Sequence, residues 1–394
     1  MREGWRWFGP DAGVTLDEVR QAGATDIVSA LHDVPIGDVW TDAAVAQRKN
    51  LIEATPAGRT PLQWTVVESI PIPDAVKRKG KAARAEIDAW IASLEAVGRA
   101  GIRIVCYNFM PVVDWCRTDL DYETPTGSTA MRFDQRKMAV FDVCVLERAD
   151  IGKDYTPAEI AAARALYASM SEAEVTSLTH NITAALPGST SEPLTIPEFR
   201  DKLLQYRDID SARLRGHLVE FLAAVTPAAE ALGMTLTLHP DDPPRPLFGL
   251  PRIASTESDY AAIFAAVPSP ANGLCYCTGS LGVRADNDLP RIARRFASRI
   301  AFAHLRSTRR ETPDSRSFHE AGHLEGDVDM VAVLRELLDE DRKRDAAHKI
   351  VFRSDHGQKM IGDFSRRGAP GYPVTGRLRG LAELRGVIAA LEHV

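Results

Sequence analysis

Short apolar runs alternate with segments of helical periodicity along most of the chain. TDIVSAL, at residues 25–31, is a continuous apolar run of the kind found in strands that are buried on both faces. Residues 82–100 instead carry apolar side chains at helical spacing. The full pattern predicts strands near residues 5, 25, 62, 103, 235, 273, 300 and 349, alternating with eight helices. This count predicts an α/β fold, a single (β/α)8 TIM barrel that spans residues 1–394.

A doubly wound open sheet is the competing fold. Its dinucleotide-binding version has G-x-G-x-x-G after the first strand, and the chain has no such motif there. The barrel is therefore the favoured architecture.

The alternation of strands and helices is interrupted over residues 109–209. Three helix starts lie in this segment, each marked by a capping box at Thr156, Ser171 or Thr195 with a glutamate three residues later. We therefore expect a long, mainly helical insertion after the fourth strand, placed where barrels carry lids and specificity elements.

Two helix starts are also predicted outside the insertion. Thr15 should cap a first helix through about residue 21. Asp327 should cap a later helix, with an apolar stripe of Val328, Val331, Leu334 and Leu338.

Composition narrows the class of protein. The 394 residues are 45% hydrophobic and carry a formal net charge of -6, which gives no basic surface for nucleic acid or for an anionic membrane. The first ten residues lack the apolar core of a signal peptide, and no apolar run is long enough to cross a membrane. The five cysteines have no disulfide-framework spacing. We expect a cytoplasmic homo-oligomer with reduced thiols and a small-molecule partner.

Four successive late strands end in residues that bind metals. They are His239, Cys277, His304 and Asp355. Because the carboxyl ends of barrel strands meet at one rim, these side chains are expected to share one divalent ion. A thiolate with two imidazoles favours zinc or ferrous iron from ligand softness alone.

Other polar residues near the strand ends suit a small oxygen-rich acid. Arg306 is a candidate clamp for a carboxylate, although a surface ion pair is an equal alternative. Asn108 and Glu68 end earlier strands, where they would bind substrate hydroxyls or only satisfy backbone groups. His356 is a candidate general acid or base, and Tyr372 is a weaker proton donor.

The stretch HEAGH, His319 to His323, matches the H-E-x-x-H signature of zinc proteases. That signature needs a helix of several turns to bring both rings to one face. Gly322 lies inside the motif and Gly326 follows closely, which disfavours such a helix. We therefore expect His319, Glu320 and His323 to belong to an active-site loop or to serve the structure.

Long motifs distributed over nearly the whole chain resemble the mannonate dehydratase family of sugar-acid lyases. They are WRWFGP, RQAGAT, VCYNFMPVVDW, HPDDPPRP, CTGSLGVRADND, HLRST, FHEAGHLEGDVDM, SDHG and GRLRGLAELRG. The resemblance implies a xylose-isomerase-like barrel with one Mn²⁺ or Fe²⁺ per chain. It also implies dehydration of D-mannonate to 2-keto-3-deoxy-D-gluconate in hexuronate (glucuronate) catabolism. For the ion, this implication takes precedence over the zinc suggested by softness.

Site residues follow from the same resemblance, motif by motif. It implies that His239, Cys277, His304 and Asp355 are the metal ligands, and that His356 and Tyr372 transfer protons. The chain departs from the family at Ser354, where the family has a proline before the aspartate. A metal-dependent sugar isomerase on the same barrel, a non-catalytic sugar-acid binding protein and a metalloprotease remain as alternatives.

Overall fold

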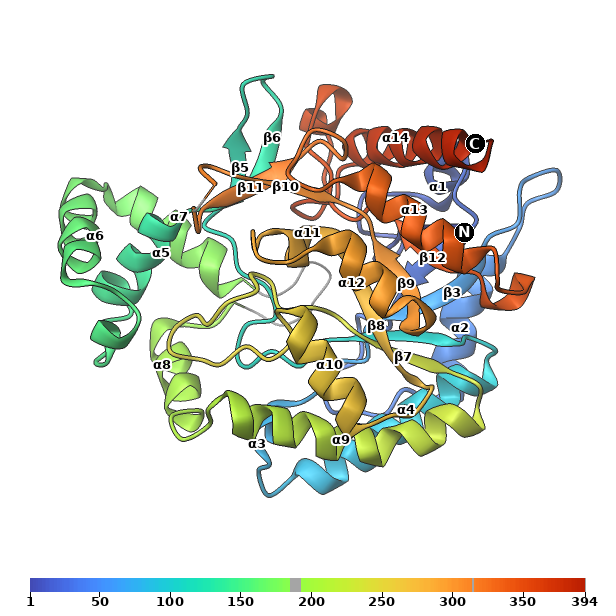
Figure 1. Ribbon diagram of the computed structural model, residues 1–394, viewed down its shortest axis with the longest axis horizontal. Coiled ribbons are helices and arrows are strands. Elements are labelled where there is room, and N and C mark those ends of the chain that lie inside the picture. Colours follow the sequence, from blue (N-terminus) through green and yellow to red (C-terminus); the bar gives the residue numbers. More distant parts are fainter. Residues whose placement is uncertain (185–192, 314, 394) are drawn as a thin grey trace.

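Eight parallel strands form a closed barrel in the computed structural model, which describes residues 1–184, 193–313 and 315–393 (Figure 1). Strands that follow one another around the barrel also follow one another along the chain, except that β1 pairs with β12 to close it. All eight predicted strands are confirmed. They are β1 (Arg2–Arg6), β2 (Asp26–Ser29), β3 (Gln63–Glu68), β4 (Ile104–Tyr107), β7 (Thr235–Leu238), β8 (Asn272–Cys277), β9 (Ile300–His304) and β12 (Val351–Arg353).

Helices connect these strands and cover the outside of the barrel. They are α1 (Leu16–Ala22), α2 (Asp42–Glu53), α3 (Asp74–Arg78), α4 (Ala83–Arg99), α9 (Ser211–Ala231), α10 (Glu257–Ala266), α11 (Thr278–Gly282), α12 (Leu289–Arg295), α13 (Met330–Asp341) and α14 (Val374–Glu392). The predicted capping box at Thr15 is present at the start of α1. The C-terminal helix α14 packs against α13 and α1, and so covers the join between the two ends of the barrel.

The barrel interior is filled by side chains from alternating strand positions. Val28, Val66, Cys106, Cys275, Phe302 and Val351 form one buried apolar cluster there. A much larger cluster lies between the strands and the surrounding helices. Because both faces of these strands are covered, every residue of β2, β8 and β12 is buried, including the polar Asp26 and Arg353. No helix among the described residues combines the length and apolarity needed to cross a membrane.

The prediction for α13 was partly wrong. Asp329, not Asp327, caps this helix, and the Asp327 carboxylate instead accepts a hydrogen bond from the backbone N–H of Arg310. Val331 is 42% exposed, whereas Val333 and Leu337 are buried. Leu334 and Leu338 lie on the buried face of α13 as predicted, and Val333 and Leu337 take further buried positions in place of Val331.

The segment 109–209 contains the expected helices and an additional hairpin. Its α-helices are α5 (Gln135–Val140), α6 (Pro157–Ser169), α7 (Glu172–Thr183) and α8 (Ile196–Gln205), and its strands are β5 (Asp119–Glu123) and β6 (Thr129–Phe133). The three predicted capping boxes are all present. The helices lie to one side of the barrel around their own apolar core, which includes Phe141 and Phe199 (Figure 1).

A second sheet joins this segment to a late part of the chain. Its strand order is β10 (Ser307–Arg310), β11 (Phe318–Ala321), β6 and β5, and all three pairings are antiparallel. Phe318 lies opposite Phe133 in this sheet, and their rings stack with centroids 5.6 Å apart. The hairpin is thus fixed to the loop that follows β9. Sequence analysis missed this sheet because its pairing joins segments nearly 200 residues apart.

Candidate active site

The carboxyl ends of the barrel strands surround a cavity of about 60 Å³. Its walls come from β1, β3, β4, β7, β9 and β12 or the residues directly after them, and from the start of the 109–209 segment. The lining residues are Arg6, Glu68, Ser69, Cys106, Asn108, Asp114, Trp115, His239, Asp242, Arg306, Arg353, Asp355, His356 and Tyr372. This is the end of the barrel where catalytic residues of TIM-barrel enzymes lie.

The four predicted metal ligands converge at this rim. Single donor atoms of His239, Cys277 and His304 all lie within 4.8 Å of one another. His239 Nε2 is 3.2 Å from His304 Nδ1. The Oδ2 atom of Asp355 is 3.9 Å from Cys277 Sγ and 3.9 Å from His304 Nδ1. Two imidazoles and a thiol are therefore arranged around one point, and the Asp355 carboxylate lies beside two of them.

Charge interactions adjust the protonation of these groups. Burial opposes ionisation of the Cys277 thiol, but the Arg306 guanidinium and the two histidines hold its pKa well below the usual value. Burial also disfavours a charged His239, yet its hydrogen bond to Cys277 and the charge of that thiolate raise its pKa to about 10. Binding of a metal would displace the proton of His239, and a thiolate with two neutral imidazoles is a donor set that fits a divalent transition metal. The residues present thus fit the ion that the resemblance implies.

A second group of possible donors lies one layer deeper, at Cys106, Cys275 and His304. Cys275 Sγ is 3.4 Å from His304 Nε2. Burial and the adjacent Cys106 raise the pKa of Cys275 well above the usual value, so this thiol stays protonated. A protonated thiol is a poor metal ligand. The shallower group is accordingly the better metal site.

Asp355 is held in place from several directions. Its backbone has φ near 50°, in the left-handed region that few non-glycine residues adopt. Its carboxylate forms ion pairs with Arg353 and, at 2.6 Å, with Arg306 Nε. Burial alone would raise the pKa of Asp355, but Arg353 and other nearby cations hold it well below the usual value. The preceding Ser354 donates its hydroxyl to the Arg377 carbonyl at 3.0 Å, which fixes the turn without a proline.

Arg306 lines the cavity, but a carboxylate lies within ion-pair distance of every nitrogen of its guanidinium. Nη1 is 2.5 Å from Glu320, Nη2 is 2.6 Å from Asp242, and Nε pairs with Asp355. Arg117 from the 109–209 segment binds the same Asp242 and Glu320 carboxylates. These ion pairs are all buried. Arg306 therefore connects three carboxylates, and its predicted contact with a substrate remains a prediction.

Glu68 and Asn108 both border the cavity, as their positions at strand ends predicted. Glu68 accepts two hydrogen bonds from Arg353, pairs with Arg6 at 2.9 Å, and lies 3.5 Å from His304 Nε2. Burial would raise the pKa of Glu68, but Arg353 and Arg6 hold it well below the usual value. Glu68 is therefore a carboxylate in the resting protein, shared by two arginines.

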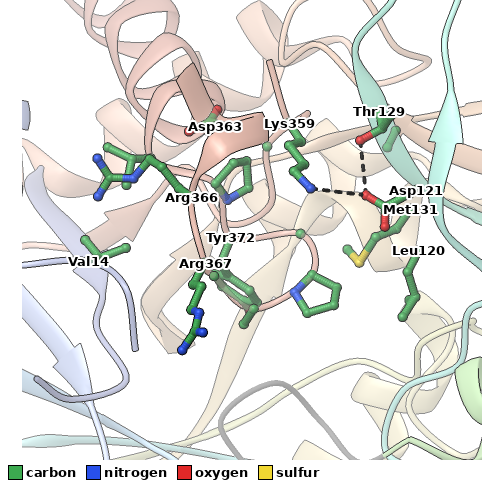
Figure 2. A pocket seen from close by; sticks show the side chains of 18 residues that line it. Val14, Leu120, Asp121, Thr129, Met131, Lys359, Asp363, Arg366, Arg367 and Tyr372 are labelled. Carbon is green, nitrogen blue, oxygen red and sulfur yellow. Dashed lines mark hydrogen bonds and ion pairs between the residues drawn. The ribbon is translucent and has the colours of Figure 1, made fainter. Parts of the chain in front are cut away.

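The two predicted proton-transfer residues lie side by side. The rings of His356 and Tyr372 meet edge to face with centroids 5.0 Å apart. His356 Nδ1 is 3.3 Å from Glu320, so that carboxylate orients the ring. Burial raises the pKa of Tyr372 to about 12. Tyr372 also borders a second cavity of about 100 Å³, where Lys359 extends toward Asp121 on the β5–β6 hairpin (Figure 2).

The HEAGH stretch is not a protease helix, as its glycines indicated. Its first half lies in β11, where neighbouring side chains point to opposite faces. Glu320 points into the arginine network, while the ring of His319 packs against Tyr122 with centroids 5.4 Å apart. His323 Nε2 instead bonds the Ser354 carbonyl at 2.5 Å. The two histidines therefore belong to different environments.

Sequence analysis missed the buried charges that hold the site together. These are Arg6, Arg117, Asp242 and Arg353, and it left the role of Glu320 open. A signal was present for two of them. Arg353 interrupts the apolar strand KIVFRSD, and Asp242 lies in HPDDPP directly after a predicted ligand. A charged residue within a buried strand requires a partner of opposite charge. That partner, Glu68, is 285 residues away and could not be identified from spacing.

Comparisons with known proteins all point to the same protein family. The family model for D-mannonate dehydratase (UxuA) matches residues 1–394. A mannonate dehydratase of Brucella canis is 68% identical over 392 residues, covering 100% of this chain and 98% of its own. One of Chromohalobacter salexigens is 50% identical, and the match covers 100% of both chains.

Solved structures agree with the sequence comparisons. The crystal structure of mannonate dehydratase from Streptococcus suis serotype 2 superposes with a TM-score of 0.77 at 29% identity, covering 100% of this chain and 94% of that one. A xylose isomerase domain protein of Planctomyces limnophilus reaches 0.50 at 9% identity over 99% and 96% of the two chains, which shows the shared fold alone. The family match over the full length, together with these relatives, shows that the chain belongs to the D-mannonate dehydratase family.

Proposed function

We propose that this protein is a metal-dependent hydro-lyase that converts D-mannonate to 2-keto-3-deoxy-D-gluconate and water. Membership of the D-mannonate dehydratase family supplies the reaction. The observation that carries the chemistry is the convergence of His239, Cys277, His304 and Asp355 at the mouth of the barrel. A site with this donor set beside a histidine and a tyrosine suits removal of a proton and of a hydroxyl group.

The same four residues would hold the ion, which we propose to be one Mn²⁺ or Fe²⁺ per chain. When bound, the ion supplies Lewis-acid stabilisation of the negative charge that develops on substrate oxygens. The protein prepares this site by keeping Cys277 as a thiolate and Asp355 as a carboxylate. Both are then available as ligands without prior loss of a proton.

Proton transfer would be the task of His356 and Tyr372. Dehydration removes the hydrogen at C2 and releases the hydroxyl at C3 as water, so one base and one acid are required. Because Glu320 engages His356 Nδ1, the opposite ring nitrogen, Nε2, is the one that exchanges a proton. Tyr372, with its pKa raised to about 12, carries its proton at neutral pH and would therefore be the acid rather than the base. The resulting enol then tautomerises to the 2-keto acid.

The remaining site residues would position these groups and the substrate. Asn108 lines the cavity, and its amide would bind substrate hydroxyls. Glu68 would do the same while bound to Arg353. Arg306 would contact substrate only by giving up one of its carboxylates, so its main effect would be to fix Asp355.

We also propose that the 109–209 segment closes one side of the site and contributes to specificity. Asp114 and Trp115, near its start, already line the cavity. As an enzyme of sugar-acid catabolism, the protein would act in the cytoplasm as a homo-oligomer.

The direct test is incubation of the purified protein with D-mannonate, with and without chelator and with added Mn²⁺. We expect a 2-keto-3-deoxy acid to form, the activity to disappear with chelator, and Mn²⁺ to restore it. Product analysis also distinguishes an isomerase, which would conserve the elements of water. A metal-loaded sample that binds D-mannonate without any turnover would contradict the proposal.

A further inference from the structure

Three arginines line the active-site cavity, and in two of them a carboxylate lies within ion-pair distance of every guanidinium nitrogen. All three nitrogens of Arg306 face carboxylates, as described above. Arg353 directs Nε and Nη2 to Glu68 and Nη1 to Asp355. A guanidinium in this state is already neutralised and geometrically fixed. Neither residue is able to take an anionic ligand without breaking a buried ion pair.

Arg6 differs from both. Its only ion pair within the described part of the chain is the 2.9 Å contact of Nη1 with Glu68, a carboxylate that already accepts two hydrogen bonds from Arg353. Its Nε has no hydrogen-bond partner among the described residues; the Nε of Arg306 has none there either, but that atom lies 2.6 Å from the Asp355 carboxylate. Its side chain is 9% exposed, compared with 3% for Arg353 and 2% for Arg306. Arg6 is thus the most accessible of the three cations and the least neutralised.

The position of Arg6 is also suitable for a substrate. It is the last residue of β1, next in the barrel to β12, which leads into Asp355 and His356. Its guanidinium lies over the Phe8 ring at 4.9 Å, and the same ring meets Tyr372 edge to face at 4.9 Å. Phe8 therefore contacts both Arg6 and Tyr372. A group bound by Arg6 would lie close to the proposed proton-transfer residues.

We infer that Arg6 binds the carboxylate of the sugar-acid substrate, the role that sequence reasoning assigned to Arg306. The inference rests on the proposed function, because it requires an anionic substrate. An arginine with unused N–H groups binds a carboxylate strongly, since charge-assisted hydrogen bonds are about twice as strong as neutral ones. Arg6 would thereby favour an acid over a neutral ligand of the same shape.

The test compares an anionic ligand with a neutral one of the same shape. KM for D-mannonate and Ki for D-mannonamide are measured in metal-loaded wild type and in Arg6→Gln. Wild type should favour the acid over the amide. Arg6→Gln should raise KM for D-mannonate about 10- to 100-fold, the loss expected when a hydrogen bond to a charged group is removed. Ki for the amide should change by less than about threefold.

Two further variants control for structure. Arg2→Gln removes an arginine from the opposite end of the same strand, where it pairs with Asp26, and should leave KM unchanged. Arg6→Lys keeps the charge beside Glu68 and should fall between wild type and Arg6→Gln in its preference for the acid. If Arg6→Gln does not fold, KM for D-mannonate and Ki for D-mannonamide in Arg6→Lys test the inference instead.

The inference is overturned if KM for D-mannonate is unaffected, or if acid and amide lose affinity equally, as a purely structural role would predict. The inference is also overturned if wild type shows no preference in affinity for D-mannonate over D-mannonamide. The proposed function fails independently, in a wild type that does not convert D-mannonate at all.

Discussion

Cys275 and Cys277 lie two residues apart on β8 and point to the same side of the strand, yet their surroundings differ completely. Cys277 lies at the rim, within reach of His239, His304 and Asp355. Cys275 lies one layer deeper, in an apolar cluster with Val28 and Phe302. Both thiols are fully buried. The difference between them is therefore one of charge and not of exposure to solvent.

This comparison shows that residue type alone does not define a ligand. Each cysteine belongs to a geometrically acceptable group of donors that includes His304. Arg306 and the two histidines lower the pKa of Cys277 against the effect of burial, whereas burial and the adjacent Cys106 raise the pKa of Cys275. The rim is organised by paired charges and the layer below it by packing. Each region should therefore respond to different perturbations.

The largest effect is expected from Cys277→Ser. Loss of the thiolate removes one of four ligands, so metal content should fall from about one ion per chain to a small fraction, and turnover should fall more than about 100-fold. Metal analysis after gel filtration, with kcat measured on the same sample, checks both. Full metal content in this variant would place the ion elsewhere and would remove the contrast between the two cysteines.

His356→Ala separates proton transfer from metal binding within the rim. Turnover should fall about 10²- to 10⁴-fold, the usual contribution of a general acid or base. Metal content should stay near one ion per chain, because the four proposed ligands remain. Unchanged turnover would exclude His356 from the mechanism, and loss of the metal would show that it acts on the ligands instead.

Lowering the pH should destabilise the paired charges at the rim at a higher pH than it affects the apolar layer below. Although burial opposes it, pairing with Arg117 and Arg306 lowers the pKa of Asp242 to about 2 in the folded protein. A lowered pKa stabilises the fold above the unfolded value near 4, and this stabilisation is lost as the pH falls toward 2. The contribution is about 2 kcal/mol. Denaturant unfolding between pH 5 and 2 measures it, and the slope should be smaller in Asp242→Asn.

The smallest effect is expected from Cys275→Ala. Removing a sulfur from the apolar layer should lower the free energy of unfolding by about 1 kcal/mol, and this loss should not depend on pH. Metal content and turnover per bound ion should be close to wild type. A large loss of metal would show that the deeper group of donors takes part in binding after all.

Sequence reasoning correctly predicted the strands and helix starts that depend on local sequence patterns. The eight strands are confirmed, and most of them are largely apolar runs bounded by turn residues. Three of the predicted ligands, His239, Cys277 and His304, lie together because strand ends share one rim. Helix starts were correct where a complete capping box was present, and wrong at Asp327, where an aspartate two residues later caps α13 instead. The arginine network was not predictable, because partners such as Arg117 and Glu320 are 203 residues apart.

The four-stranded sheet outside the barrel has a mechanical consequence. Backbone hydrogen bonds link the β5–β6 hairpin to β11, and β11 carries Glu320, whose carboxylate holds Arg306 and orients His356. A length change in the hairpin would shift this carboxylate without any altered residue touching the substrate. The β5–β6 hairpin, although it lies outside the barrel, thus helps to position catalytic residues, and its length is a determinant of their geometry.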